Sequence, residues 1–153
     1  GAEGGLAIRE QAAQIKKLVG LTTKQAGAVR NYEKLLISEK RNPAQIKRMV
    51  DKYKARQLAF RSRNIARTES IRAANAGQQE LWRQAMDQGL ISRTAKRVWI
   101  ITPDDRLCQI CEPIPDLNEE GVGLNQPFAT EQGAVMFPPA HPQCRCAVGL
   151  TDT

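Results

Sequence analysis

The sequence predicts an α+β chain, with an N-terminal helical part that contains a long basic helix, followed by a small, loop-rich β subdomain stapled by zinc. Apolar residues recur at helical spacing up to about residue 90. Seven of the eight prolines then fall between Pro103 and Pro142, and all four cysteines and the single histidine lie after residue 107. We therefore expect a helical body over residues 1–90 and a Cys/His-rich metal-binding subdomain over 91–153, packed on the long helix.

Three helices are expected in the first part. Apolar residues over 6–19 follow a helical period that ends before a glycine. Thr22 and Gln25 form a capping-box pattern at the start of a second helix. Asn42 and Pro43 supply a cap and a first-turn proline for a third helix, which has no strong breaker before Gly89.

The third helix carries a face that is apolar at first and polar further along. At 100° per residue, the apolar members are Ile46, Met49, Val50, Tyr53, Phe60 and Ile71. Asn64, Thr68 and Asn75 continue the same face. A polar stripe in this position marks the place where the helix meets something other than an apolar core.

Positive charge is concentrated in the first part of the chain. Residues 1–99 hold 21 Lys and Arg against 8 Asp and Glu, whereas residues 100–153 hold 2 against 8. The predicted basic binding surface of the long helix consists of Lys47, Arg48, Lys52, Lys54, Arg56, Arg61 and Arg63. Such a surface attracts nucleic acid or an acidic protein ring without selecting between them, and a plain solvated helix face is the alternative.

The segment after residue 90 changes character. Residues 96–102 are β-branched and aromatic and predict a strand, and 147–150 predict a second strand that pairs with it. The proline-rich stretch between them has little apolar mass to bury and requires a staple. No apolar run exceeds four residues, so no membrane-spanning helix is expected. The N-terminus, which lacks Met and a signal peptide, is expected to be internal to a longer chain or trimmed.

Five potential metal ligands provide that staple. They are Cys108, Cys111, His141, Cys144 and Cys146. A Cys-x2-Cys turn brings two thiolates to one ion, and a second group of ligands closes the tetrahedron. Zinc suits soft sulfur ligands best, and four of the five would bind it. Disulfides or merely buried thiols are the alternative. With four protein ligands the site would hold structure and not catalyse.

Four segments resemble the phage Mu F-like minor head proteins, the phage head morphogenesis family. Residues 64–69 with 73–77 are similar to the "I-A-R-T-E … A-N-x-G" helix of that family, and residues 96–100, 105–111 and 138–146 follow in the same order. The likeness spans about residues 20–150 and corresponds to the C-terminal portion of the usually longer family proteins. Each motif alone is modest, but four in the same order are specific.

The resemblance implies a structural minor capsid protein of a tailed bacteriophage. Family members act in head morphogenesis at the portal vertex and are linked to DNA packaging or release. Phage portal protein, the inner capsid and non-specific double-stranded DNA are the implied partners, with neither a membrane nor a small-molecule substrate. The implied location is the virion, with the host cytoplasm during assembly.

The motif residues suggest a joint between the two parts of the chain. We hypothesise that Asn64, Thr68 and Asn75 hydrogen-bond the irregular backbone of the C-terminal part. Arg67 would pair with an acid such as Asp104 or Asp105. Asp104, Asp105 and Arg106 by themselves predict a turn with a local ion pair, and plain surface residues are the alternative.

Two other function classes compete with the capsid interpretation. One is a zinc-stabilised, non-specific nucleic-acid-binding module without a capsid role. The other is an enzyme in which Cys144 and His141 form a nucleophile pair or Asp105 or Glu69 acts as a base. A phosphate-binding loop and a His-Glu-x-x-His motif are both absent from the sequence, so we expect no enzyme and no catalytic residue.

Overall fold

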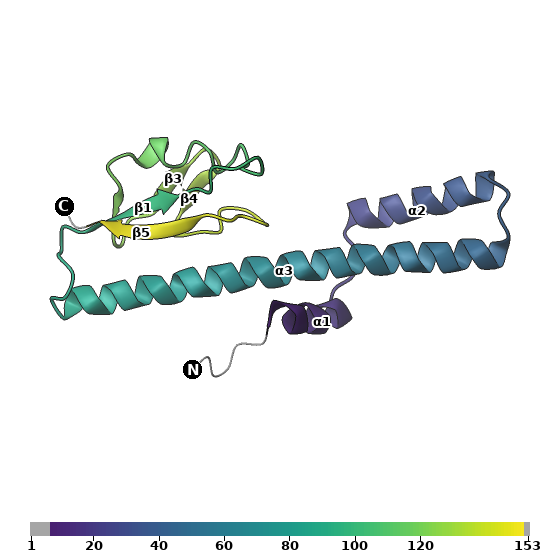
Figure 1. Ribbon diagram of the computed structural model, residues 1–153, viewed down its shortest axis with the longest axis horizontal. Coiled ribbons are helices and arrows are strands. Elements are labelled where there is room, and N and C mark those ends of the chain that lie inside the picture. The colour runs from purple at the N-terminus through teal and green to yellow at the C-terminus, as the bar shows by residue number, and fades with distance from the viewer. Residues whose placement is uncertain (1–6, 152–153) are drawn as a thin grey trace. The chain divides into compact units, whose positions relative to one another are not determined.

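The computed structural model describes residues 7–151, an α+β chain of three helices followed by two small antiparallel sheets (Figure 1). The chain divides into an N-terminal unit, residues 1–67, and a C-terminal unit, residues 68–153. The sequence placed this boundary after residue 90. It lies inside the long helix instead, because the last turns of that helix contact the C-terminal sheet through Gln79 and Trp82. Over the described residues, no helix combines the length and the apolar character that crossing a bilayer requires.

The three predicted helices are present, and the second and third begin at the predicted caps. They are α1 (Ile8–Leu18), α2 (Thr23–Ser38) and α3 (Pro43–Asp87). The Thr22 hydroxyl accepts from the Gln25 backbone N–H at 3.2 Å, and Gln25 Oε1 accepts from the Thr22 N–H at 3.1 Å, which completes the capping box. Asn42 Oδ1 accepts from the Ala44 N–H at 2.9 Å and caps α3.

Within the N-terminal unit, α2 runs alongside the first part of α3 (Figure 1). Val29 and Leu36 of α2 are buried. Gln25 Nε2 donates to the Gln57 carbonyl at 3.2 Å, and the rings of Tyr32 and Tyr53 lie 4.8 Å apart. The predicted apolar face of α3 is therefore the face that meets α2.

Phe60 departs from that pattern, because 49 % of its surface is exposed. The deeply buried positions in this part of α3 belong to small residues instead, with Ser62 and Ala66 each only 1 % exposed. Ala12 of α1 is also buried, and α1 and α3 line a common groove. Small side chains let two helix backbones approach closely, so a large ring at position 60 is left at the edge of the packing.

The C-terminal unit contains a three-stranded sheet in the order β2-β1-β5 and a separate β3-β4 hairpin. β1 pairs antiparallel with β5, with Trp99 opposite Val148, which confirms the predicted pairing. The sequence analysis predicted none of the shorter elements. The bounds are β1 Lys96–Ile100, the 3-10 helix η1 Asp116–Asn118, β2 Val122–Gly123, β3 Phe128–Thr130, β4 Gly133–Val135 and β5 Ala147–Thr151.

Cysteines form part of the core of this unit. The buried cluster comprises Trp99, Cys111, Ile114, Phe128, Cys144, Cys146 and Val148, and Trp82 of α3 packs against it. Both tryptophans of the chain therefore report on the same core, and the N-terminal unit has none.

A fully buried arginine links the sheet to the loops and to α3. Arg97 is 0 % exposed. Its guanidinium donates to Gln79 Oε1 at 2.8 Å and to the Met136 carbonyl at 2.6 Å, and also to the carbonyls of Gly123 and Gln126. Burial lowers the pKa of this guanidinium, and every acceptor it contacts is neutral.

Gly121 occupies a position that only glycine fits. Its φ is +68°, in the left-handed region that side chains disfavour. A Cβ at this position would lie 2.8 Å from the carbonyl oxygen of Arg97. The turn before β2 can therefore approach β1 closely enough to pair with it.

Candidate metal centre

Two turns bring the five predicted ligands together. In the first turn, the Cys111 and Glu112 backbone N–H groups donate to the Cys108 carbonyl at 3.0 and 3.1 Å, which folds the Cys-x2-Cys segment back on itself. In the second turn, the Cys144 N–H donates to the His141 carbonyl at 3.2 Å. Cys146 lies immediately before the last strand, β5.

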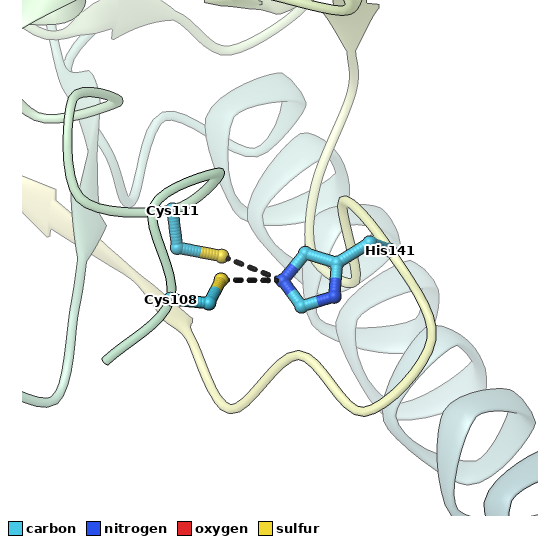
Figure 2. A group of neighbouring side chains, drawn as sticks. All are labelled: Cys108, Cys111 and His141. Atoms are coloured by element: carbon cyan, nitrogen blue, oxygen red, sulfur yellow. Dashed lines mark hydrogen bonds between the residues drawn. The ribbon is translucent and has the colours of Figure 1, made fainter. Parts of the chain in front are cut away.

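His141 points its Nε2 between the sulfurs of the first turn (Figure 2). Nε2 lies 3.0 Å from Cys108 Sγ and 3.0 Å from Cys111 Sγ. On the other side of the ring, Nδ1 lies 2.7 Å from the Pro142 carbonyl oxygen. Because a carbonyl only accepts, Nδ1 carries the proton, and the lone pair of Nε2 faces the thiols. This is the tautomer that a metal-ligating histidine adopts.

Cys111 also belongs to a second, fully buried group with Cys144 and Cys146. Within each group of three, the ligand atoms all lie within 4.8 Å of one another. Cys111 Sγ and Cys144 Sγ are 3.8 Å apart. The five donors thus form two triangles that share Cys111.

The surroundings of Cys144 favour a thiolate. The Cys146 thiol donates to its sulfur, and backbone N–H groups of Cys146 and Ala140 add to this, so the pKa of Cys144 is lowered to about 5. Burial raises the pKa of Cys111 to about 12. The pKa of Cys146 is also raised, chiefly because its thiol donates to Cys144. The hydrogen bond between the two thiols therefore favours negative charge within the Cys144–Cys146 pair.

Trp99 supplies an unused donor beside the cluster. Its buried indole Nε1–H makes no hydrogen bond of normal geometry among the described residues, although it is directed toward the Cys146 sulfur. The same group acts on the Cys146 sulfur and lowers the pKa of that thiol. A more negative sulfur would strengthen this interaction, as expected for thiolates around a metal ion.

Part of the cluster has the spacing of a tetrahedral site, because among the described residues the donor atoms come within 4.8 Å of one another in two groups of three and in no group of four. With metal–sulfur bonds of about 2.3 Å, two ligating sulfurs lie about 3.8 Å apart, and a sulfur and an imidazole nitrogen about 3.5 Å apart. The Cys111–Cys144 distance of 3.8 Å matches this value, whereas the 3.0 Å contacts of His141 would widen on binding. All five donors line a cavity of about 40 Å³. The cluster could therefore hold a metal ion.

Asp104 links the segment before the first turn to Arg145, which follows the second turn, through an ion pair. Arg145, which lies between the last two cysteines, donates to its two oxygens at 2.7 and 2.5 Å, and the Arg106 N–H donates at 3.0 Å. The Arg145 guanidinium holds the pKa of Asp104 well below its usual range. Asp104 also pairs with Arg106 at 3.3 Å, which confirms the predicted local ion pair. Its second ionic partner is Arg145, and not Arg67, which was expected to take an acid here.

The expected joint residues have different environments. Thr68 Oγ1 accepts from the Gln143 N–H at 3.4 Å, next to the ligands. Asn75 instead donates to the Ile71 carbonyl of its own helix at 2.9 Å, and Gln79, which sequence reasoning missed, donates to the Leu124 carbonyl at 2.5 Å. Asn64 is half-buried in the N-terminal unit, and Asp105 is exposed.

The predicted basic surface divides into engaged and unengaged cations. Lys47 pairs with Asp51 at 2.8 Å, and Arg61 donates to the Gly20 carbonyl at 2.8 Å. The exposed members without an ion pair among the described residues are Arg48, Lys52, Lys54, Arg56 and Arg63.

In the comparisons with known protein families, curated proteins and solved structures, the chain matches none of them. The site itself defines a candidate Cys/His metal centre in a small β unit. A role for this centre is therefore argued from the residues alone.

Proposed function

We propose that this chain is a structural minor head protein of a tailed bacteriophage, which acts in head morphogenesis at the portal vertex and contacts DNA during packaging or release. The proposal rests on the resemblance of its motifs to the Mu F-like family. It places the protein in the virion, with portal protein, inner capsid and double-stranded DNA as partners.

The observation that carries the proposal is the convergence of separate motif segments within the C-terminal unit. Thr68 belongs to the helical motif, Cys108 and Cys111 to the middle motif, and Gln143 and Cys144 to the last. Thr68 contacts Gln143, and Cys111 contacts Cys144. Motifs far apart in sequence that meet around one cluster support a common structural purpose for them.

Zinc is the metal we propose for this cluster, as a staple without an open coordination position. The proposed ligands are Cys108, Cys111, His141 and Cys144. His141 Nε2 already faces the first turn, and the Cys144 sulfur lies 3.8 Å from the Cys111 sulfur, the separation expected for two ligands of one ion. Cys146 would remain a thiol that donates to Cys144.

The ligand set predicts a difference between two matched substitutions. Cys108→Ser is expected to abolish stoichiometric zinc binding, whereas Cys146→Ser is expected to retain about one zinc per chain, since it removes only a neighbour of the ligands. Elemental analysis after purification without added metal checks this. Zinc loss in both variants would assign Cys146 to the metal, and a disulfide in the wild type would contradict the zinc proposal.

A second candidate is a non-specific nucleic-acid-binding module without a capsid role. Residues 7–67 contain 16 Lys and Arg but only 4 Asp and Glu. Among the described cations of this segment, only Arg41 and Lys47 form ion pairs, so the others are available to a negatively charged ligand, which favours this candidate.

Copurification with a portal ring separates the two candidates. We expect the tagged chain to copurify with a phage portal protein and to bind duplex DNA with a steep salt dependence. DNA binding without portal or capsid association would favour the second candidate, and the absence of both would contradict the two.

A further inference from the structure

The N-terminal unit has two hollows whose lining includes Lys and Arg side chains. Among the described residues, neither hollow is lined by a carboxylate. The first, the tyrosine notch, has a volume of about 240 Å³ and is lined by Tyr32 of α2 with Met49, Lys52, Tyr53 and Arg56 of α3. The two cations stand one helical turn apart beside the phenol pair. Lysine, arginine and tyrosine are common donors to phosphate oxygens in nucleic-acid complexes.

The second hollow, the alanine groove, lies between α1 and α3. It has a volume of about 380 Å³, with Arg9 and Lys16 of α1 and Arg63 of α3 around small residues, Ala12, Ala13, Ala59 and Ser62. Small side chains at the base of a groove allow a ligand backbone to approach the helices closely. The three cations are exposed and, in the part of the chain described, unpaired.

The cations of the two hollows lie on one side of α3. At 100° per residue, Lys52, Arg56 and Arg63 fall within about 40° of one another, and they span about 16 Å along the axis. Duplex DNA presents about nine phosphates over that length. The spacing suits an extended polyanion better than a single small anion.

A third groove, between α2 and α3, has a different character. It combines Glu33, Asp51, Arg41 and Lys47 with apolar residues such as Ile37 and Val50. Mixed charge around apolar side chains is typical of a surface for protein contact. The carboxylate-free hollows have the opposite composition, which favours a ligand of uniform negative charge.

The geometry points to a phosphate-binding track that runs from the tyrosine notch through Lys52, Arg56 and Arg63 to the alanine groove, and whose occupant is the phosphodiester backbone of nucleic acid. This inference rests on the DNA contact in the proposed function and specifies where it occurs. It assigns roles to Arg9, Lys16, Tyr32 and Tyr53, and it assigns none to Lys47, Lys54 or Arg61 of the basic surface.

Charge-matched triple variants test the track. K52Q/R56Q/R63Q removes three track cations, and K34Q/K47Q/K54Q removes three exposed cations elsewhere in the same unit. Binding of a fluorescent 30-base-pair duplex is measured by anisotropy at several salt concentrations. For the track variant we expect affinity at least about tenfold weaker than for the control, and a log–log salt slope smaller by about 3. R9Q/K16Q, which leaves α3 intact, should also weaken binding.

Each of the other outcomes would contradict one specific part of the proposal. Equal weakening by both triple variants would refute the track while leaving DNA binding in place. A wild-type chain that fails to bind duplex even at low salt would refute the DNA contact itself. Competition by poly-glutamate as effective as competition by unlabelled DNA would replace nucleic acid with an acidic protein as the occupant. Circular dichroism and melting curves confirm that each variant is folded.

Discussion

Removal of the proposed zinc ion is expected to unfold the C-terminal unit while the helices of the N-terminal unit persist. A structural zinc contributes roughly 10 kcal/mol in small metal-dependent domains, which is comparable with the whole folding free energy of a domain. Cys111, shared by both donor triangles, lies in the core with Trp99, so the loss of the ion removes the centre of that core. Tryptophan fluorescence, which reports only on this unit, should shift to the red on chelation, while most of the helical circular dichroism at 222 nm remains.

Two controls accompany this experiment. A chelator saturated with zinc before addition should leave the fluorescence unchanged, and Cys111→Ser should reproduce the chelated spectrum in the absence of chelator. An unchanged emission maximum after verified metal removal would show that the core holds without the ion.

Replacement of Arg97 by methionine is expected to destabilise the C-terminal unit by at least about 3 kcal/mol. The substitution leaves Gln79 Oε1 and the carbonyls of Gln126 and Met136 without the Arg97 donor, whereas the Gly123 carbonyl still accepts from the Gln126 N–H. An acceptor left unsatisfied in the interior costs about 1–3 kcal/mol. Urea unfolding followed by tryptophan fluorescence measures the change.

The neighbouring Lys96 provides the matched control. Lys96→Met removes a cation from the same strand, but its partner Glu120 is 3.7 Å away and almost fully exposed. Such a pair contributes about 0–1 kcal/mol. Equal effects of the two substitutions would show that the hydrogen bonds of Arg97 are not what stabilises the unit.

The elements with strong local signals could be predicted from the sequence. Caps at Thr22 and Asn42 and an uninterrupted helical period set the helices, and the β-branched residues 96–102 set the first strand. The donor cluster was also predictable, because Cys-x2-Cys and His-x2-Cys-x-Cys are local patterns typical of ligands that converge on one metal ion.

The remaining features depend on packing that leaves no local trace. Arginine is rarely fully buried, so nothing in the sequence marks Arg97, or its acceptor Gln79, as central. Arg67 was the expected partner of an acid such as Asp104, whereas the turn between Cys144 and Cys146 places Arg145 beside that carboxylate. The small residues of α3 contribute little to the hydrophobic periodicity of the sequence. In the structure, however, they are the buried positions in the part of α3 that faces α1, and Phe60 is left exposed.

The turn before β2 bears on which natural variants of this chain can exist. Any side chain at position 121 would require an unfavourable left-handed backbone conformation, and its Cβ would also clash with the carbonyl oxygen of the buried Arg97. No single compensating change nearby relieves both problems, since one lies in the backbone and the other in the strand that holds Arg97. Selection at this codon should therefore be almost absolute, whereas the exposed loop residues around it are free to drift.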